Sequence, residues 1–103
     1  MARTIDELQE ILSNVPGVKK AYYQPPESVK LVYPCIIYSM NGIRSNHADD
    51  IIYKSKKRYS VIVIDKDSES TIGDYIMENV PYVGFDRMYT SDNLYHYTYT
   101  LFF

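Results

Sequence analysis

The sequence predicts an α+β fold: a mainly antiparallel, or mixed, sheet of four to five strands, with two helices packed on one face and a projecting hairpin or loop. Three patterns predict it: an amphipathic helical pattern near the N-terminus, an apolar β-branched run in mid-chain, and an alternating aromatic run at the C-terminus. With 103 residues the chain can bury one modest core, so we expect residues 1–103 to form a single domain.

The first helix is predicted over about residues 5–14. Thr4 and Glu7 have the spacing of a capping box, in which each side chain accepts a backbone N–H of the other residue. Asn14, Pro16 and Gly17 provide the stop signals. Between them, apolar residues recur at helical spacing on one side, at Ile5, Leu8, Ile11, Leu12 and Val15.

Two strands are predicted next. Residues 18–23 can form a short strand, and Pro25-Pro26 makes it an edge strand or an extended arm, because proline cannot donate to a ladder. Residues 32–40 form the following strand, which the Asn41-Gly42 turn signal is expected to end. Residues 43–57 then suggest a long two-stranded excursion with a polar tip.

The central strand is predicted at Val61 to Ile64. This continuous apolar block is typical of a strand that is covered on both faces, so we place it in the middle of the sheet. A basic run precedes it and acids follow from Asp65. The two ends of the strand should therefore carry opposite charges.

A second helix and two strands complete the chain. Four residues between the central strand and this helix could cap it: Asp67, Ser68, Glu69 and Ser70. Its predicted buried face is Ile72, Tyr75, Ile76 and Val80, and Pro81 ends it. A strand over 84–89, a hairpin turn at 91–93 and a last strand follow. One face of that last strand should carry Tyr95, Tyr97, Tyr99, Leu101 and Phe103.

Composition narrows the function. The formal net charge is −2, so no overall basic field attracts nucleic acid or anionic lipid. No apolar run is long enough to span a membrane, and the N-terminus lacks the apolar centre of a signal peptide, so we expect a cytoplasmic protein. Cys35 is the only cysteine and lies in an apolar strand, which favours a small buried hydrophobe over a reactive thiol. Twelve tyrosines suit half-buried sheet faces and protein interfaces.

Two acidic patterns could suggest metal or acid–base chemistry. Asp65, Asp67 and Glu69 alternate as in a calcium loop, but the loop's glycine and its bidentate acid are missing. His47 precedes Asp49-Asp50, yet the second histidine is far along the chain. There is also no nucleophile elbow and no phosphate-binding glycine cluster. We therefore expect no catalytic residue, metal site or cofactor.

The one basic cluster, with tyrosines beside it, resembles an aromatic-plus-basic surface for single-stranded nucleic acid. Alternation along a strand would divide its charges between two faces, which favours a solvated strand end or a protein interface. A small nucleic-acid-binding module remains an alternative function. The cluster is Lys54, Lys56, Lys57 and Arg58, with Tyr53 and Tyr59.

Several short motifs over about residues 30–103 together resemble the tail terminators, or tail-completion proteins, of tailed phages, prophages and phage-tail-like particles. They are Tyr33-Pro34-x-Ile36-x-Tyr38, Ala48-Asp49, Tyr53, Lys57-Arg58-Tyr59, Val63-Ile64-Asp65-Lys66-Asp67, Phe85-Asp86-Arg87-x-Tyr89 and Asp92-Asn93-Leu94-x-His96. Each motif alone is weak, but their string is more specific. The first 30 residues contribute only a compatible helix.

The resemblance implies a small α+β structural protein of the virion. It would form a closed ring, usually a hexamer, on the head-proximal end of the tail tube, stop tube polymerisation and present a surface for head attachment. Its partners would be the tail tube protein and a head connector or completion protein, with DNA only passing through the lumen. Assembly would take place in the host cytoplasm. Members of the family are not enzymes and bind no cofactor. Another head–tail connector or head-completion protein is the alternative.

Two sets of residues are candidates for contacts in such a ring. The subunit-interface candidates are basic residues that would meet acids of the next copy: Lys56, Lys57 and Arg58 with Asp65, Asp67 and Glu69. The candidates for docking on the tail tube lie in the polar part of the excursion: Arg44, Asn46, His47, Asp49 and Asp50. An ordinary flexible loop is the alternative for that segment.

Overall fold

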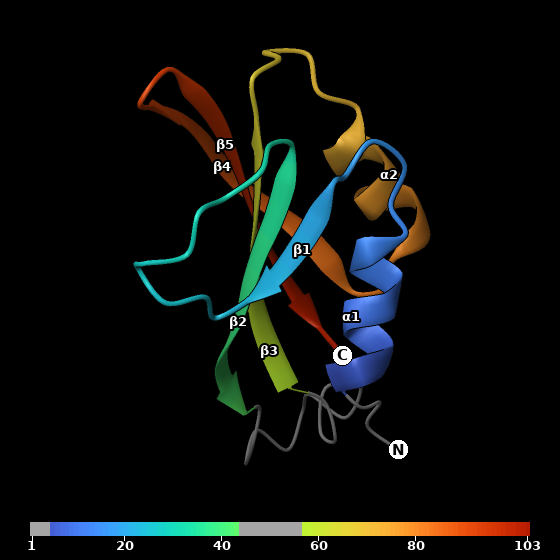
Figure 1. Ribbon diagram of the computed structural model, residues 1–103. Coiled ribbons are helices and arrows are strands. Elements are labelled where there is room, and N and C mark those ends of the chain that lie inside the picture. Colours follow the sequence, from blue (N-terminus) through green and yellow to red (C-terminus); the bar gives the residue numbers. More distant parts are fainter. Residues whose placement is uncertain (1–4, 44–56) are drawn as a thin grey trace.

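The computed structural model describes residues 5–43 and 57–103. Its elements are α1 (Ile5–Ser13), β1 (Lys20–Tyr23), β2 (Cys35–Ile43), β3 (Lys57–Asp65), α2 (Ile72–Asn79), β4 (Val83–Ser91) and β5 (Leu94–Phe102) (Figure 1). The five strands form one sheet in the order β1-β2-β3-β5-β4. Only the β1–β2 pair is parallel, so the sheet is mixed. The predicted α+β class is confirmed.

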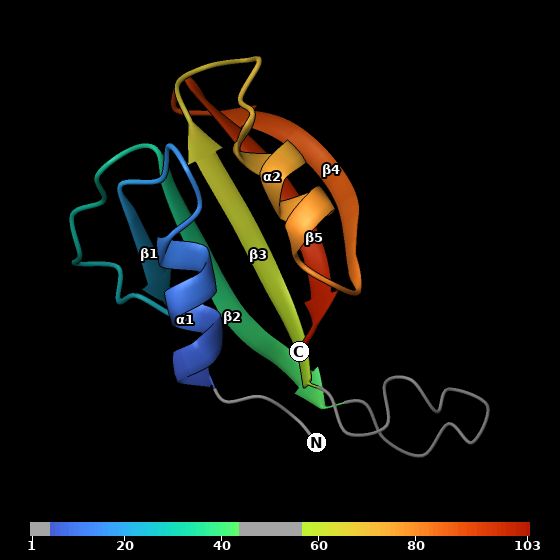
Figure 2. The same ribbon diagram turned by 90° about the vertical axis from the view of Figure 1, so that its right-hand side faces the viewer.

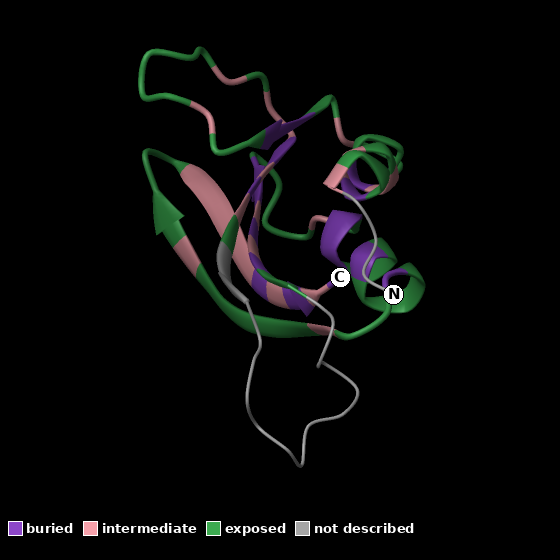
Figure 3. Cartoon of the chain, turned by 90° about the horizontal axis from the view of Figure 1, so that it is seen from below, coloured by how far each residue is buried: buried purple, intermediate pink, exposed green. Residues whose placement is uncertain are grey.

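β3 occupies the middle of the sheet, as its apolar block predicts. Its alternate residues Tyr59, Val61 and Val63 are buried and belong to the main core cluster. The same cluster includes Leu8 and Leu12 of α1 and Ile72 and Ile76 of α2. Figure 2 shows the ribbons of both helices in front of the sheet, and in Figure 3 the buried residues gather where helices and strands meet.

The second face of β3 is covered only in part. Ile64 is 4% exposed and packs with Tyr22 and Cys35, while partly buried Leu31 and Tyr33 of the β1–β2 connection lie against this smaller cluster. In the middle of β3, the side chains on this face are only half buried. On this second face, a long connection rather than another layer of helices covers one end of the strand. Because that end is covered on both faces, the apolar block is continuous.

β2 differs from its predicted bounds at both ends. It begins at Cys35 rather than Val32, and it continues through Asn41-Gly42, which was predicted to end it. The pairing register with β3 shifts between Met40 and Gly42, and Ile43 then pairs with Lys57. A β-bulge thus accommodates this dipeptide within a long strand pair, because tertiary pairing overrides the local turn preference.

Of the two alternatives predicted after the first helix, an edge strand or an extended arm, the edge strand is confirmed, since among the described strands β1 pairs with β2 alone. The side-chain amide of Gln9 in α1 donates to the carbonyl of Ala21 at 3.1 Å. The oxygen of the same Gln9 amide accepts a hydrogen bond from the hydroxyl of Tyr38 in β2. One polar side chain of α1 therefore fixes the helix against two strands.

The second helix is present, but two expectations for it are wrong. Its N-cap is Thr71, not a residue of 67–70, and the cap makes no side-chain hydrogen bond. Ile72, Ile76 and Val80 are buried as predicted, whereas Tyr75 is 39% exposed. Tyr75 lines the open groove between the two helices, which accounts for its partial exposure.

The C-terminal hairpin follows the sequence closely. Asp92 and Asn93 have φ angles of 54° and 63°, and Ser91 pairs with Leu94, so these two residues form the tight turn. Consecutive positive φ angles are characteristic of a type I′ turn, which Asp and Asn tolerate better than most residues. The buried side chains at the end of the chain alternate as predicted, at Tyr99, Leu101 and Phe103. No helix among the described residues is long and apolar enough to cross a membrane.

Tyr99 of β5 packs directly on Gly73 of α2. A Cβ atom built on Gly73 would lie 1.7 Å from the Tyr99 hydroxyl oxygen and 2.8 Å from the ring carbon that carries it. Tyr99 is buried, so its ring cannot move into solvent to relieve this contact. Glycine at position 73 therefore allows α2 to lie close to β5.

We expect Gly73→Ala to lower the free energy of unfolding by about 1–2 kcal/mol, because the overpacking at Tyr99, which costs about 1–3 kcal/mol, outweighs the gain of about 1 kcal/mol in helix propensity. Urea unfolding followed by circular dichroism measures the change. Gly84→Ala is the matched control, because its added methyl group would meet nothing within 4 Å. An equal or higher stability of Gly73→Ala would contradict the close packing.

Burial also affects the titration of the core. It raises the pKa of Tyr99 to about 12, and burial, with the neighbouring Tyr23, Tyr59 and Asp6, raises the pKa of Tyr38 to about 12. An unfolded tyrosine ionises near pH 10. Between these values the unfolded chain binds fewer protons than the folded one, so the stabilising contribution is complete below about pH 10 and is lost as the pH rises toward 12.

We expect the free energy of unfolding to fall between pH 10 and pH 12 by up to about 1.4 kcal/mol per pH unit for each of these two tyrosines. Denaturant unfolding at a series of pH values checks this. Tyr38→Phe should make the dependence less steep by the contribution of one tyrosine. A stability that stays constant to pH 12 would disprove the expectation.

Candidate functional site

The basic end of β3 is exposed. Lys57 and Arg58 open the strand, and both side chains reach solvent. In the sheet, Lys57 pairs with Ile43 and Arg58 with Gly42 on one side and with Phe102 on the other. Lys56, the third basic candidate, lies outside the described residues. The strand pairing therefore fixes two of the three predicted basic residues at one end of the sheet.

The acidic end of β3 is a hydrogen-bonded turn. Asp65 Oδ1 accepts the backbone N–H of Asp67 at 3.1 Å, and Asp67 Oδ1 accepts that of Glu69 at 2.9 Å. The hydroxyl of Tyr97 donates to the carbonyls of Asp67 and Ser68, at 3.2 and 2.9 Å. Successive Asx turns and a tyrosine anchor thus hold the acids in place.

Only two of the three predicted acids are presented to solvent. Asp67 and Glu69 are exposed, whereas Asp65 is 8% exposed and its carboxylate is used within the turn. Asp65 therefore shapes the acidic end and does not offer a surface charge. Within the residues that the structure describes, no three His, Cys, Asp or Glu side chains converge as a metal site would require.

The two charged ends are far apart within one subunit. β3 has nine residues, and eight rises of about 3.3 Å place its ends about 26 Å apart. Lys57 and Arg58 therefore cannot contact Asp67 and Glu69 of the same subunit, which lie in the turn beyond the far end of the strand. A contact between the predicted partners thus requires a second copy.

The predicted tube-docking residues lie outside the described residues: Arg44, Asn46, His47, Asp49 and Asp50. The structure does define where their segment joins the fold. Ile43 ends β2, Lys57 begins β3, and the two residues are direct partners in the sheet. The two described residues that flank this segment therefore lie side by side at the basic end of the sheet.

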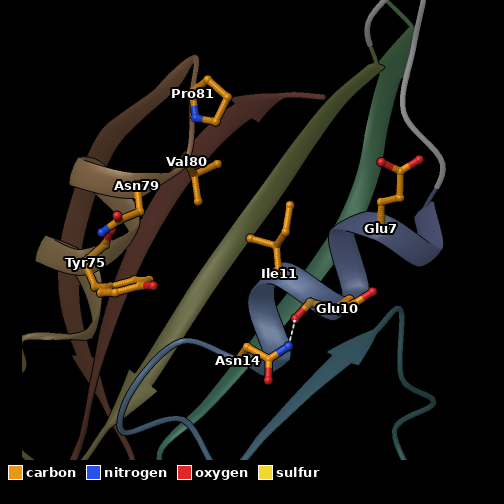
Figure 4. Close-up of a pocket in the computed structure, with 8 residues that line it drawn as sticks. All are labelled: Glu7, Glu10, Ile11, Asn14, Tyr75, Asn79, Val80 and Pro81. Atoms are coloured by element: carbon orange, nitrogen blue, oxygen red, sulfur yellow. Dashed lines mark hydrogen bonds between the residues drawn. The ribbon is translucent and has the colours of Figure 1, made fainter.

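A groove between the helices was not predicted from the sequence. It has a volume of about 520 Å³ and runs between α1 and α2 (Figure 4). Ile11, Val80 and Pro81 supply its apolar lining, and its polar groups are Glu7, Glu10, Asn14, Tyr75 and Asn79. The amide groups of both asparagines donate to carbonyls of their own helices. The groove is thus rich in acceptors and suits a cationic or hydrogen-bond-donating side chain.

No local sequence pattern predicts this groove, because its two walls lie more than 60 residues apart in the chain. Tyr75 was the available signal: its place in the helical pattern assigned it to the core, but its hydroxyl needs a partner or water. Among the described residues that line it, none is a cysteine, a histidine or a basic residue.

Cys35 is buried among apolar side chains, and burial raises the pKa of its thiol to about 11. The thiolate is therefore scarce near neutral pH, and solvent does not reach the sulfur. This placement agrees with the prediction that Cys35 is a small buried apolar residue.

Aromatic and basic side chains also meet on the exposed β4–β5 surface. The Arg87 guanidinium lies 5.2 Å from the ring centre of Tyr89, and that ring stacks on His96 at 4.7 Å. Register explains the stack, because Tyr89 and His96 are cross-strand partners. The sequence placed His96 on a strand but did not reveal its partner.

Comparisons with known proteins add no family to these observations: a scan against family models, a search of curated proteins and a search of solved structures each found no match to this chain.

Proposed function

We propose that this protein is a structural, non-catalytic subunit that forms a ring, most simply a hexamer, on the head-proximal end of a phage tail tube. The ring would end tube polymerisation and provide the surface to which the head attaches. The resemblance of the motifs over residues 30–103 supports this proposal, and so does the described arrangement of charges.

The observation that carries the proposal is the separation of opposite charges along β3. Exposed Lys57 and Arg58 stand at one end, and exposed Asp67 and Glu69 stand at the other. A patch that complements a different patch on the next copy makes a heterologous contact, and such contacts close into a ring when the rotation between copies allows it. The ordered acidic turn supports this reading, because a held carboxylate loses little entropy on pairing.

Single contacts of this type are weak. An exposed ion pair contributes on the order of 0–1 kcal/mol, so two free subunits would bind each other poorly through charges alone. A ring repeats the contact at every interface, and the tube end supplies a template. We therefore propose that the ring forms on the tube, with residues 44–56 at the basic end as the segment that docks there.

The same proposal assigns the other partners. A head connector or completion protein would bind the opposite ring face, and DNA would pass through the lumen. A formal net charge of −2 supports passage without tight binding, since tight binding of DNA requires a basic surface. The protein would assemble in the host cytoplasm and remain in the virion.

Tails assembled with and without the protein test the ring. In electron micrographs, tails that lack it should be abnormally long or headless. Cross-linking of complete tails, followed by mass determination, should give several copies of the protein at the head-proximal end. One copy per tail end, or normal tails in its absence, would refute the proposal.

We expect Arg58→Glu to impair tail capping, since it places an acid opposite the acidic turn of the next subunit. Tail length and the fraction of tails joined to heads, counted by electron microscopy, measure the effect. Glu69→Lys in the same chain should restore part of the lost function. Lys30→Glu is the matched control, because Lys30 is equally exposed but lies in the β1–β2 connection. Normal capping by Arg58→Glu would remove Arg58 from the interface.

A further inference from the structure

The two edges of the sheet are protected differently. β1 is four residues long, and Gln9 of α1 caps the carbonyl of Ala21 on it. β4 is nine residues long, and no strand of the described chain pairs with its outer edge. Figure 2 shows β4 along the outer side of the sheet. A long strand edge without a neighbour is a template for pairing with another chain.

β4 also presents apolar side chains. Phe85 is 50% exposed and Met88 is 48% exposed. Phe85 pairs with Tyr99 and Met88 with Tyr97, and these two partners lie on the face of β5 that contributes to the core. Directly paired residues in a sheet point to the same face, so Phe85 and Met88 belong to the core-side face of β4.

A bulge changes the alternation in the middle of β4. Phe85 pairs with Tyr99 and Arg87 with Thr98, which leaves Asp86 as the extra residue. The carboxylate of Asp86 accepts the hydroxyl of Thr100, a residue of the opposite face, at 2.7 Å. Asp86 and Arg87 therefore both lie on the opposite face, with a core-side residue before and after them.

The order of faces along β4 is consequently symmetric about the Asp86–Arg87 peptide. Core-side residues stand at 83, 85, 88 and 90, and residues of the opposite face at 84, 86, 87 and 89. In a regular strand, a residue and its chain neighbour point to opposite faces, so they could never be partners across a two-fold axis. The bulge removes that obstacle.

We propose that two copies of this chain pair through their β4 strands, antiparallel, about a two-fold axis at the Asp86–Arg87 peptide. Asp86 of each copy then lies opposite Arg87 of the other, on one face of a ten-stranded sheet. Phe85 lies opposite Met88 on the other face. The axis is perpendicular to the sheet, so each face of one copy continues the same face of the other.

The charges of Asp86 and Arg87 determine both which strand can pair with the edge of β4 and in which register it pairs. A shift of one residue would set Arg87 opposite Arg87 or Asp86 opposite Asp86, and like charges placed directly opposite are destabilising. A strand without the acid–base pair would leave both charges unmatched, which is how charged edges repel unrelated strands. The antiparallel second copy satisfies both charges and covers both exposed apolar side chains.

This pairing goes beyond the proposed ring and does not depend on it. A two-fold contact closes after two copies and uses β4, whereas the ring would use the ends of β3. The pairing concerns the purified protein in solution. Its area is that of a single strand pair, so the dimer should dissociate on dilution.

Sedimentation of the purified protein over a range of concentrations tests the inference. We expect a monomer–dimer equilibrium, and we expect Arg87→Asp and Asp86→Arg each to weaken the dimer at least about tenfold. The variant that carries both substitutions, Asp86→Arg with Arg87→Asp, should dimerise with itself and should not mix with the wild type. Lys30→Glu, on an exposed connection, should leave the equilibrium unchanged.

Amide hydrogen exchange supplies a second measurement that does not depend on the variants. At high protein concentration, amides of residues 83–91 should become more protected than at low concentration. Circular dichroism establishes that each variant is folded. A wild type that remains monomeric at every concentration would overturn the pairing, and so would a swapped variant that fails to dimerise although it is folded. Neither result bears on the ring, which is tested on tails.

Discussion

The position of β3 constrains the rest of the molecule. Hydrogen bonds to β2 on one side and β5 on the other hold its whole length in register, so the strand cannot slide without displacing both partners. Its core-side residues pack against both helices, and its two ends lie at opposite ends of the sheet. Segregated charge at the two ends is therefore a direct consequence of one apolar run flanked by bases and acids.

Patterns confined to one segment were predictable. The first helix, the Asp92–Asn93 turn and the alternation of the last strand depend on residues close in the chain, and the structure agrees with all three. Propensity, turn chemistry and the period of two act over a few residues, so a single sequence is sufficient to read them.

Features that join distant segments were not predictable in the same way. Asn41-Gly42 became a bulge because β3 offered pairing partners beyond it. The acidic turn after β3 is anchored by Tyr97, which lies 30 residues farther along the chain and donates its hydroxyl to the carbonyl of Asp67. The groove beside Tyr75 exists only because α1 and α2 come together. In each case the neighbour that decides the outcome lies far along the chain, and no local pattern identifies it.

The paired anchors of residues 44–56 have a consequence for variation within this fold. Ile43 and Lys57 are held side by side by the sheet, so the closure of the segment is already determined by strand pairing. The entropic cost of closing a loop grows only slowly with the length of the loop, by about 0.6 kcal/mol for each doubling. The length and sequence of this segment could therefore diverge widely between descendants of one ancestor while the remaining sheet stays unchanged. Partner choice and fold stability would then evolve almost independently of each other.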